Sequence, residues 1–184
     1  MRGKSHRYLG KYLADRYLAS SPKRYVYAFL LGCVEPDKNP ATYLKGSLRH
    51  QWLRGHNFGN AQRYMGRICG NLQSKEKLKI IDYYKLGKLI HYTADAFTYV
   101  HNEQFDANLS DHRGYEHALQ DYFLSYLNSE PAEDQHCQDC AITAIRHYHR
   151  DYIRHPVSIQ TDSDYAFRAS CCVFKHFCQQ KIPS

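Results

Sequence analysis

The sequence predicts an all-α fold, a single-domain bundle of about six or seven helices. Almost every apolar segment repeats at the three- and four-residue spacing of a helix. We find no convincing segment in which apolar and polar residues alternate, as they do along a half-buried strand. The 184 residues, 43% of them hydrophobic, are enough to bury one sizeable core.

The chain begins with two predicted helices and a long loop. Ser5 is a favourable N-cap for a helix over residues 5–19, whose apolar residues recur at helical spacing. Pro22 favours the first turn of a second helix, which we expect to end by Gly32. Residues 33–58 contain two prolines and two glycines and show no period, so we expect an irregular loop. A loop of this length in a compact domain is usually functional.

Helical patterns continue to the C-terminal region. We expect further helices over residues 59–72, 75–102, 110–128, 132–154 and 162–181. Breaks between the last three are predicted at Pro131 and Pro156. No repeat or low-complexity tract divides the chain, so we treat residues 1–184 as one domain. Residues 129–184 carry predicted helices but no motif that points to a function.

Charge and cysteine content narrow the possible partners and location. The net charge of +7 favours acidic or phosphate-bearing partners, but it is not concentrated in one block, as in a dedicated nucleic-acid arm. Seven cysteines, an odd number, fit free thiols better than a closed disulfide framework. The longest apolar run, residues 25–34, is half of the roughly 20 residues that span a bilayer. With no recognisable signal peptide, we predict a cytoplasmic protein without a transmembrane segment.

The stretch HYTADAFTYVH places His91 and Asp95 on one face of a helix that is otherwise apolar. One His-x-x-x-acid pair is expected by chance in a chain with 12 histidines. A second pair, His112 and Glu116, has the same spacing on the next predicted helix. Imidazole and carboxylate are the usual zinc ligands of hydrolytic sites, and helix bundles bind metals through such inward pairs. Together the two pairs predict a metal centre.

His101 fits this centre only with a change in the backbone. On a straight helix His101 lies about 80° around the axis from His91, at about 100° per residue. It can join the same site only if the helix ends or bends near Tyr99 to Asn102.

These residues resemble the signature of the zinc-dependent phospholipase C family, His-x3-Asp-x5-His followed by His-x3-Glu. GKLIHYTADAFTYVHNEQF and HRGYE carry the match. The resemblance extends toward the N-terminus in three further segments. LLGCVEPDKNP resembles the family turn that makes Asp37 the active-site carboxylate. RGHNFGNAQRYM resembles the family segment in which a histidine ligand precedes a helix, and this histidine is His56 here. KSHRYLGKYLA resembles the N-terminal helix of the family, whose histidine ligand would be His6.

The resemblance implies a bundle of the phospholipase C and zinc nuclease type that holds two to three zinc ions. His56, His91 and Asp95 would hold one ion. A second ion would be held by the remaining signature residues, His101, His112 and Glu116. Asp95 would bridge the first ion to a third one bound by His6. The cations would neutralise phosphodiester oxygens and activate a water, with Asp37 as general base.

One departure from the family concerns the third ion. In secreted relatives the amino group and carbonyl of an N-terminal Trp also hold it. This chain has Met1 five residues before His6, and its single Trp is Trp52 in the predicted loop. The third site is therefore expected to be weak, or to be completed by water or by another residue.

Several other candidates have simpler interpretations. His50 competes with His56 as a ligand, although the residues around His56 fit the family better. His117 lies about 100° around the helix from Glu116 and is expected to be structural. Cys137-x-x-Cys140 lacks a partner pair at the spacing of a zinc knuckle. The helix with His147, His149 and His155 also carries arginines, and we expect its polar face to be solvated.

Three functions remain open at this point. The first is a metal-dependent phosphodiester hydrolase of the phospholipase C type, acting on a phospholipid head group with transient contact to a membrane surface. The second is a single-strand nuclease-like phosphodiesterase, since fungal nucleases share the fold and ligand set and a positive chain suits a polyanion. The third is a metal-binding protein without turnover.

Overall fold

The computed structural model describes residues 1–39, 57–102, 109–132 and 140–181. These residues form seven α-helices and a 3₁₀ turn, with no strand among them. The helices are α1 (Gly3–Tyr17), α2 (Lys23–Lys38), α3 (Phe58–Gln73), α4 (Ile80–Ala96), α5 (Leu109–Asn128), α6 (Ala141–Tyr152) and α7 (Ile159–Lys181). The 3₁₀ turn η2 (Tyr99–His101) follows α4. The predicted all-α bundle is confirmed.

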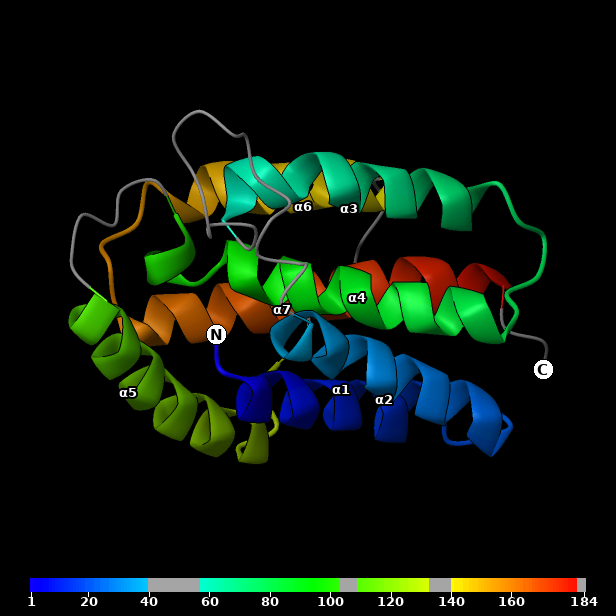
Figure 1. The fold of residues 1–184 in the computed structure, drawn as a ribbon, viewed down its shortest axis with the longest axis horizontal. Helices are drawn as coiled ribbons and strands as arrows, with labels where there is room; N and C mark the ends of the chain where they lie inside the picture. The colour runs from blue at the N-terminus through cyan, green and yellow to red at the C-terminus, as the bar shows by residue number, and fades with distance from the viewer. Residues whose placement is uncertain (40–56, 103–108, 133–139, 182–184) are drawn as a thin grey trace.

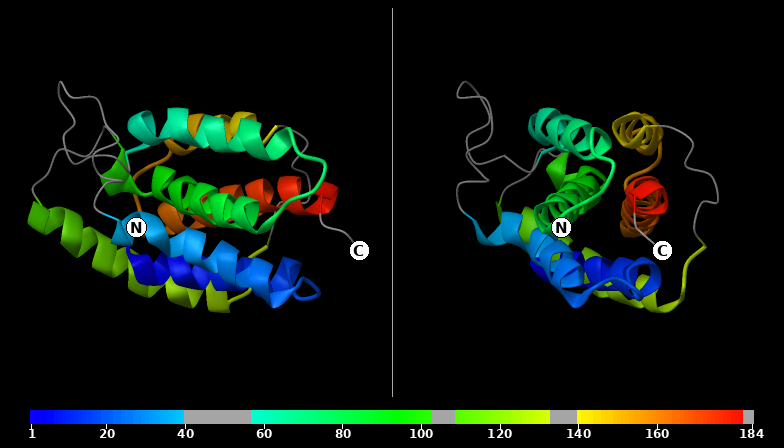
Figure 2. Two further views of the ribbon diagram at one scale, coloured as in Figure 1. Left: turned by 45° about the vertical axis from the view of Figure 1, so that its right-hand side comes forward. Right: turned by 90° about the vertical axis from the view of Figure 1, so that its right-hand side faces the viewer.

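The helices lie in three layers (Figures 1 and 2). α4 and α7 form the middle layer, with α3 and α6 on one side and α1, α2 and α5 on the other. α4 is buried on nearly all sides, as expected of a helix surrounded by other helices. Several of its polar side chains, His91 and Asp95 among them, therefore face the interior of the bundle.

α2 packs against α4 at very short range because both helices have a glycine at the contact. A Cβ atom on Gly32 would lie 2.1 Å from the Tyr84 carbonyl oxygen. One on Gly87 would lie 2.1 Å from the carbonyl oxygen of Phe29. Any other residue at these positions would force the two helices apart. The contact brings the C-terminal end of α2 directly over the middle of α4.

A buried ion pair also ties these two helices together. Lys88 Nζ lies 2.7 Å from Glu35 Oε2, and the Lys88 side chain is almost entirely covered. Burial would lower the pKa of Lys88, but the hydrogen bond and charge of Glu35 outweigh it and raise that pKa. Asn39 donates a hydrogen bond to Glu35 at 2.7 Å. The last turn of α2 is therefore held on α4 by polar contacts as well as by packing.

Several predicted boundaries differ from the structure, and the helix predicted over residues 132–154 begins only at Ala141. α2 continues to Lys38, so residues 33–38 are helical and the predicted loop over residues 33–58 begins too early. Pro36 lies inside α2, where it removes one backbone hydrogen bond without ending the helix. α1 begins at Gly3, with Ser5 buried inside it rather than at its N-cap. Of the predicted loop, residues 40–56 are outside the described residues.

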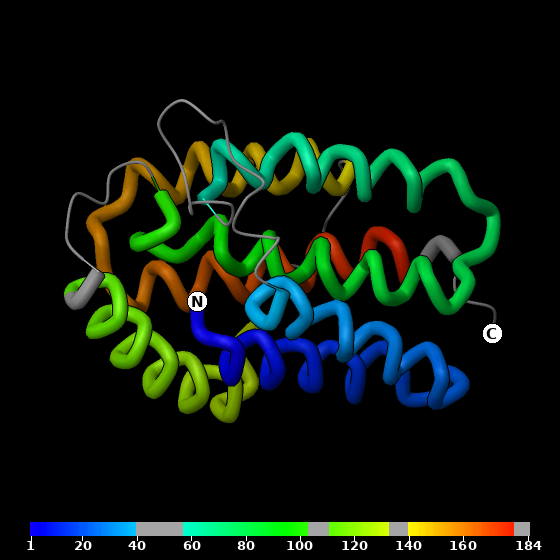
Figure 3. The backbone as a smooth tube through the Cα atoms, viewed as in Figure 1, coloured from blue at the N-terminus to red at the C-terminus, as the bar shows by residue number. Residues whose placement is uncertain are grey.

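The predicted helix over residues 75–102 is also shorter than expected. α4 ends at Ala96, and the backbone turns away from the helix axis through Phe97 and Thr98 into η2 (Figure 3). A break in this region was required for His101 to join the site, and it occurs a few residues earlier than predicted. In the part of the chain that the structure describes, no helix combines the length and apolar character needed to cross a membrane.

Candidate metal centre

His91 and Asp95 lie on the buried face of α4, as their spacing predicts. His91 Nε2 is 3.2 Å from Asp95 Oδ2, and neither side chain is exposed to solvent. His91 Nδ1 lies 2.9 Å from the carbonyl oxygen of Cys33 on α2. Because a carbonyl only accepts, Nδ1 must carry the proton, and the lone pair of neutral His91 is on Nε2. The ring is therefore oriented to offer Nε2 to a cation, in the manner of zinc-bound histidines.

α1 brings His6 to the other oxygen of Asp95. His6 Nε2 is 3.1 Å from Asp95 Oδ1, and the His6 ring stacks on His91 with centroids 3.7 Å apart. Ligand atoms of His6, His91 and Asp95 all lie within 4.8 Å of one another. We call these three residues the first trio.

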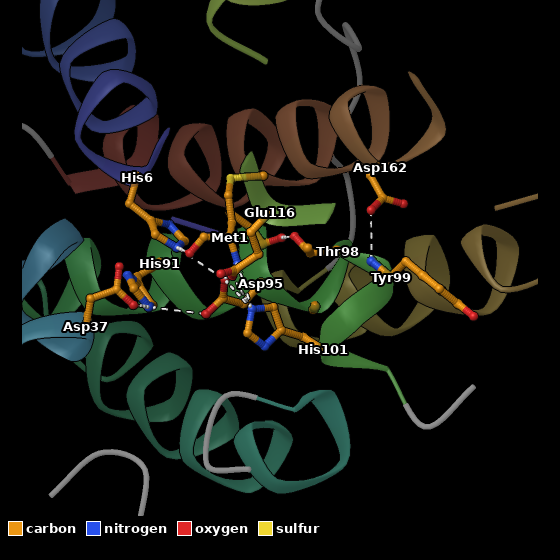
Figure 4. Close-up of polar contacts among 12 residues, drawn as sticks. Met1, His6, Asp37, His91, Asp95, Thr98, Tyr99, His101, Glu116 and Asp162 are labelled. Carbon is orange, nitrogen blue, oxygen red and sulfur yellow. Dashed lines mark hydrogen bonds and ion pairs between the residues drawn. The ribbon is translucent and has the colours of Figure 1, made fainter. Parts of the chain in front are cut away.

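His101 reaches the site from the turn after α4. Its Nε2 is 3.6 Å from Asp95 Oδ1 and 3.3 Å from Glu116 Oε1 (Figure 4). On α5, His112 Nε2 is 3.6 Å from the same Glu116 oxygen. Ligand atoms of His101, His112 and Glu116 lie within 4.8 Å of one another. We call them the second trio, and it is the set predicted for the second ion.

The N-terminal amino group of Met1 lies between the two trios. Its nitrogen is 2.7 Å from Asp95 Oδ1, 3.0 Å from Glu116 Oε1 and 2.6 Å from His101 Nε2. The Met1 carbonyl oxygen is 3.1 Å from His6 Nε2. The amino group and carbonyl of Met1 thus lie beside Asp95 and His6, the two residues that the family resemblance assigns to a third ion. The sequence contained one signal for this, since Met1 is only five residues from His6.

Burial and charge act in opposite directions on the acidic groups of the centre. Burial would raise the pKa of Asp95, but the Met1 ammonium and the surrounding imidazoles of His101, His6 and His91 hold it well below its usual value. Burial is outweighed in the same way at Glu116, where the Met1 ammonium and hydrogen bonds from histidines lower the pKa. Both groups are therefore carboxylates at neutral pH, as cation ligands must be.

The amino group and the histidines respond to the same environment. Burial would lower the pKa of the Met1 amino group, but Asp95 and Glu116 raise it to about 10. Burial and the Met1 ammonium lower the pKa of His101 to about 4. Burial and the neighbouring His91 also lower the pKa of His6. At His91, burial is outweighed by Asp95, which raises the pKa. In this structure the ammonium supplies the positive charge that the two carboxylates require.

Asp37 lies at the edge of the first trio, on the last turn of α2. Its Oδ1 is 3.6 Å from His91 Nε2, and 22% of the Asp37 side chain is exposed. Gly3 permits this approach, since a Cβ there would be 3.1 Å from Asp37 Oδ2. The predicted loop therefore does not deliver Asp37 to the site; the α2–α4 contact does.

Of the predicted ligands, His56 lies outside the described residues, as do His50 and Trp52. Its assignment to the first ion with His91 and Asp95 remains a prediction. In the described residues His6 takes the place beside these two side chains. The other six predicted ligands converge on one centre. They are His6, His91, Asp95, His101, His112 and Glu116.

The remaining candidates lie outside the centre. His117 contacts Arg2, so it holds the start of the chain against α5. His149 is not on a solvated face, because its ring stacks on Phe58 at 3.6 Å and its Nε2 donates to Asn102 Oδ1 at 2.7 Å.

The cysteines partly follow the expectation of free thiols. Cys140 accepts a hydrogen bond from Gln73, while Cys137 is outside the described residues. Free thiols are found at Cys33, Cys69, Cys140, Cys171 and Cys178. Cys172 departs from the expectation, since it is disulfide-bonded.

Comparison with known proteins agrees with this geometry. The model of the family described as zinc dependent phospholipase C matches residues 5–162. Searches of curated proteins and of solved structures gave no significant match. The family match covers most of the chain and includes both trios and Asp37. On this evidence the chain belongs to the zinc-dependent phospholipase C family.

Proposed function

We propose that the protein is a zinc-dependent phosphodiester hydrolase of the phospholipase C type, which cleaves a phospholipid between the glycerol oxygen and the head-group phosphate. One observation carries this proposal. Two sets of zinc-type ligands from α1, α4, η2 and α5 share a single buried centre, with Asp95 between them. Two-metal centres of this kind are typical of enzymes that hydrolyse phosphate esters.

The donor set fits zinc in number and chemistry. Each trio offers imidazole nitrogens and a carboxylate oxygen, and His91 is already held with Nε2 as its lone-pair nitrogen. We assign one ion to the first trio and one to the second. The amino group and carbonyl of Met1, next to His6 and Asp95, would hold a third after loss of the ammonium proton. When bound, zinc would supply Lewis acidity toward the phosphoryl oxygens and a lower pKa for water.

Asp37 is the residue we assign to proton transfer. It lies at the edge of the first trio and is 22% exposed, so substrate and water can reach it. Its carboxylate would accept a hydrogen bond from the attacking water and take its proton. A P–O bond to the water oxygen forms while the P–O bond to the glycerol oxygen breaks, and the proton ends on the released hydroxyl.

The test compares Asp37→Asn with Asp15→Asn. Both changes remove one negative charge, but Asp15 is exposed on α1, away from the centre. We expect Asp37→Asn to lower hydrolysis of phosphatidylcholine vesicles by about 10²–10⁴-fold, the usual contribution of a general base, with zinc content unchanged. Asp15→Asn should behave as wild type, and chelation should abolish activity in every variant.

Two substrates separate the competing functions. Faster cleavage of single-stranded DNA than of phosphatidylcholine would replace the phospholipase assignment with a nuclease-like one. If the wild type carries its full complement of zinc and cleaves neither substrate nor a chromogenic phosphodiester, the enzyme assignment is wrong. The protein is then a metal-binding protein without turnover.

A further inference from the structure

The second trio depends on a short turn, residues 97–102, that leaves the end of α4. This turn carries His101, yet no regular helix continues through it. Backbone hydrogen bonds from Phe97 and Thr98 join its start to α4, and side chains from other elements also hold it. Those side chains come from α6 and α7, the C-terminal helices to which the sequence assigned no function.

Asp162 of α7 is the strongest of these contacts. Its side chain is fully buried, and Oδ2 accepts a hydrogen bond of 2.8 Å from the backbone N–H of Tyr99 (Figure 4). That N–H is at the first residue of η2, two residues before His101. The bond therefore fixes the start of the turn that brings His101 to Glu116.

The same carboxylate reaches the helix that carries Glu116. Tyr115 of α5 donates its hydroxyl to Asp162 Oδ2 at 2.9 Å. Tyr115 directly precedes Glu116 and lies three residues after His112. One oxygen of Asp162 thus accepts hydrogen bonds from both segments that supply the second trio. The rings of Tyr99 and Tyr115 also contact each other, with centroids 5.6 Å apart.

A third hydrogen bond attaches Asp162 to the surrounding fold. Tyr152, at the end of α6, donates its hydroxyl to Asp162 Oδ1 at 2.7 Å. This bond satisfies the other oxygen and involves neither segment of the second trio. Burying a carboxylate costs several kcal/mol, and an apolar residue would often stabilise a core as well or better. A buried acid with donors from η2, α5 and α6 is better explained by the geometry that it imposes.

Asn102 holds the other end of the turn. Its Nδ2 donates to the carbonyl oxygens of Ala96 at 3.1 Å and Thr98 at 2.9 Å, which closes the turn on itself. Its Oδ1 accepts a hydrogen bond from His149 of α6. The turn is therefore attached at its start to α7 and at its end to α6.

From these contacts we infer that Asp162 is a positioning residue for the second metal: it holds His101 and Glu116 at the separation that a shared cation requires. The inference relies on the proposed function only for the presence of zinc. It concerns metal affinity, so it can be tested without turnover. Hydrogen-bonded residues behind metal ligands typically contribute a factor of about 10–100 to affinity.

The sharpest test compares Tyr115→Phe with Tyr152→Phe. Each variant removes one hydroxyl that donates to Asp162, so each should lower the stability of the metal-free protein by a similar amount. The two variants differ in the element that loses its hydrogen bond to Asp162. Tyr115 is on α5, which carries His112 and Glu116, whereas Tyr152 is on α6, which carries no residue of the second trio. Zinc affinity at each site is measured by competition with a chelator, and cobalt substitution gives a spectrum that reports the ligand geometry.

We expect Tyr115→Phe to weaken the second site at least about 10-fold and to change the cobalt spectrum. Tyr152→Phe should weaken it by no more than about 3-fold. Asp162→Asn should lose the second ion while the first trio keeps its own. Should that variant not fold, the comparison of the two tyrosines still decides the matter.

Equal zinc affinities in the two tyrosine variants would overturn the inference, because they would show that the hydrogen bonds of Asp162 contribute to stability alone. This result is distinct from failure of the proposed function, in which zinc binds normally and no phosphodiester is cleaved. In that case an affinity loss confined to Tyr115→Phe and Asp162→Asn still supports the positioning role.

Discussion

The two trios offer cations similar ligands but are held in different ways. The first trio lies on α1 and α4, and its side chains are at most 1% exposed. In the second trio His112 is 26% exposed and Glu116 16%, and its residues come from a turn and from α5. Close packing of α2 on α4 through Gly32 and Gly87 places the Cys33 carbonyl that orients His91 of the first trio, whereas hydrogen bonds from Asp162 and Asn102 position the turn of the second. A fully buried site and a partly exposed one thus lie side by side.

The largest effect is expected at Asp95, which belongs to the first trio and also lies 3.6 Å from His101 of the second. Asp95→Asn removes a charge from the His6–His91 pair and from His101, and it weakens the attraction for every cation nearby. We expect loss of at least one zinc ion from each molecule and a fall in hydrolysis of about 10³-fold or more. Elemental analysis and vesicle hydrolysis measure the two effects.

His112→Gln is the matched comparison for Asp95→Asn. It should lower zinc content by the second ion only and leave the first trio loaded. If the two variants lost the same ion, the two trios would not be separate sites.

The next largest effect is expected from a substitution that disturbs the packing of α2 on α4 beside His91. Gly87→Ala places a Cβ against the Phe29 carbonyl oxygen, so α2 must move and carry Asp37 and the Cys33 carbonyl away from His91. We expect the free energy of unfolding to fall by about 3 kcal/mol, at the upper end for overpacking. The first site should lose zinc affinity more than the second. Denaturant unfolding and chelator competition check both results.

Gly70→Ala is the control for this substitution. Gly70 is a helix residue with no atom near its added Cβ, so alanine there should stabilise the protein by about 1 kcal/mol. A similar loss of stability in both variants would show that the α2–α4 contact is not the cause.

The smallest effect concerns the turn and depends on pH. Burial lowers the pKa of His149 to about 4, below the value of about 6.5 in an unfolded chain. Its contribution to stability is therefore complete above pH 6.5 and is lost as the pH falls toward 4. His149→Phe keeps the stacking on Phe58 but loses the hydrogen bond to Asn102 and cannot be protonated.

At pH 7 we expect metal-free His149→Phe to be less stable than wild type by about 1 kcal/mol, the usual value of one hydrogen bond. The difference should shrink and then reverse as the pH falls to 4.5, because below pH 6.5 the unfolded wild type binds a proton at His149 that the folded protein binds only near pH 4. Urea unfolding at both pH values measures it. A difference that does not change with pH would contradict a lowered pKa at His149.

Much of the centre could be predicted because helix geometry is local. His91 with Asp95, and His112 with Glu116, share faces through their four-residue spacing alone. The angle of His101 required a break in the helix, and the structure has one. Asp37 was predicted on an irregular loop, whereas it lies on the last turn of α2, 3.6 Å from His91 Nε2, because the helix continues past Pro36.

The bundle and the spacing of the two ligand pairs could be predicted, because both arise from periodicity along single helices. The position of Met1 between the trios and the contacts of Asp162 and His149 with the turn arise from tertiary packing. These contacts join residues 47 to 94 positions apart in the chain. A hydrogen bond across that separation leaves no period in the sequence, and only the packing of the helices brings its partners together.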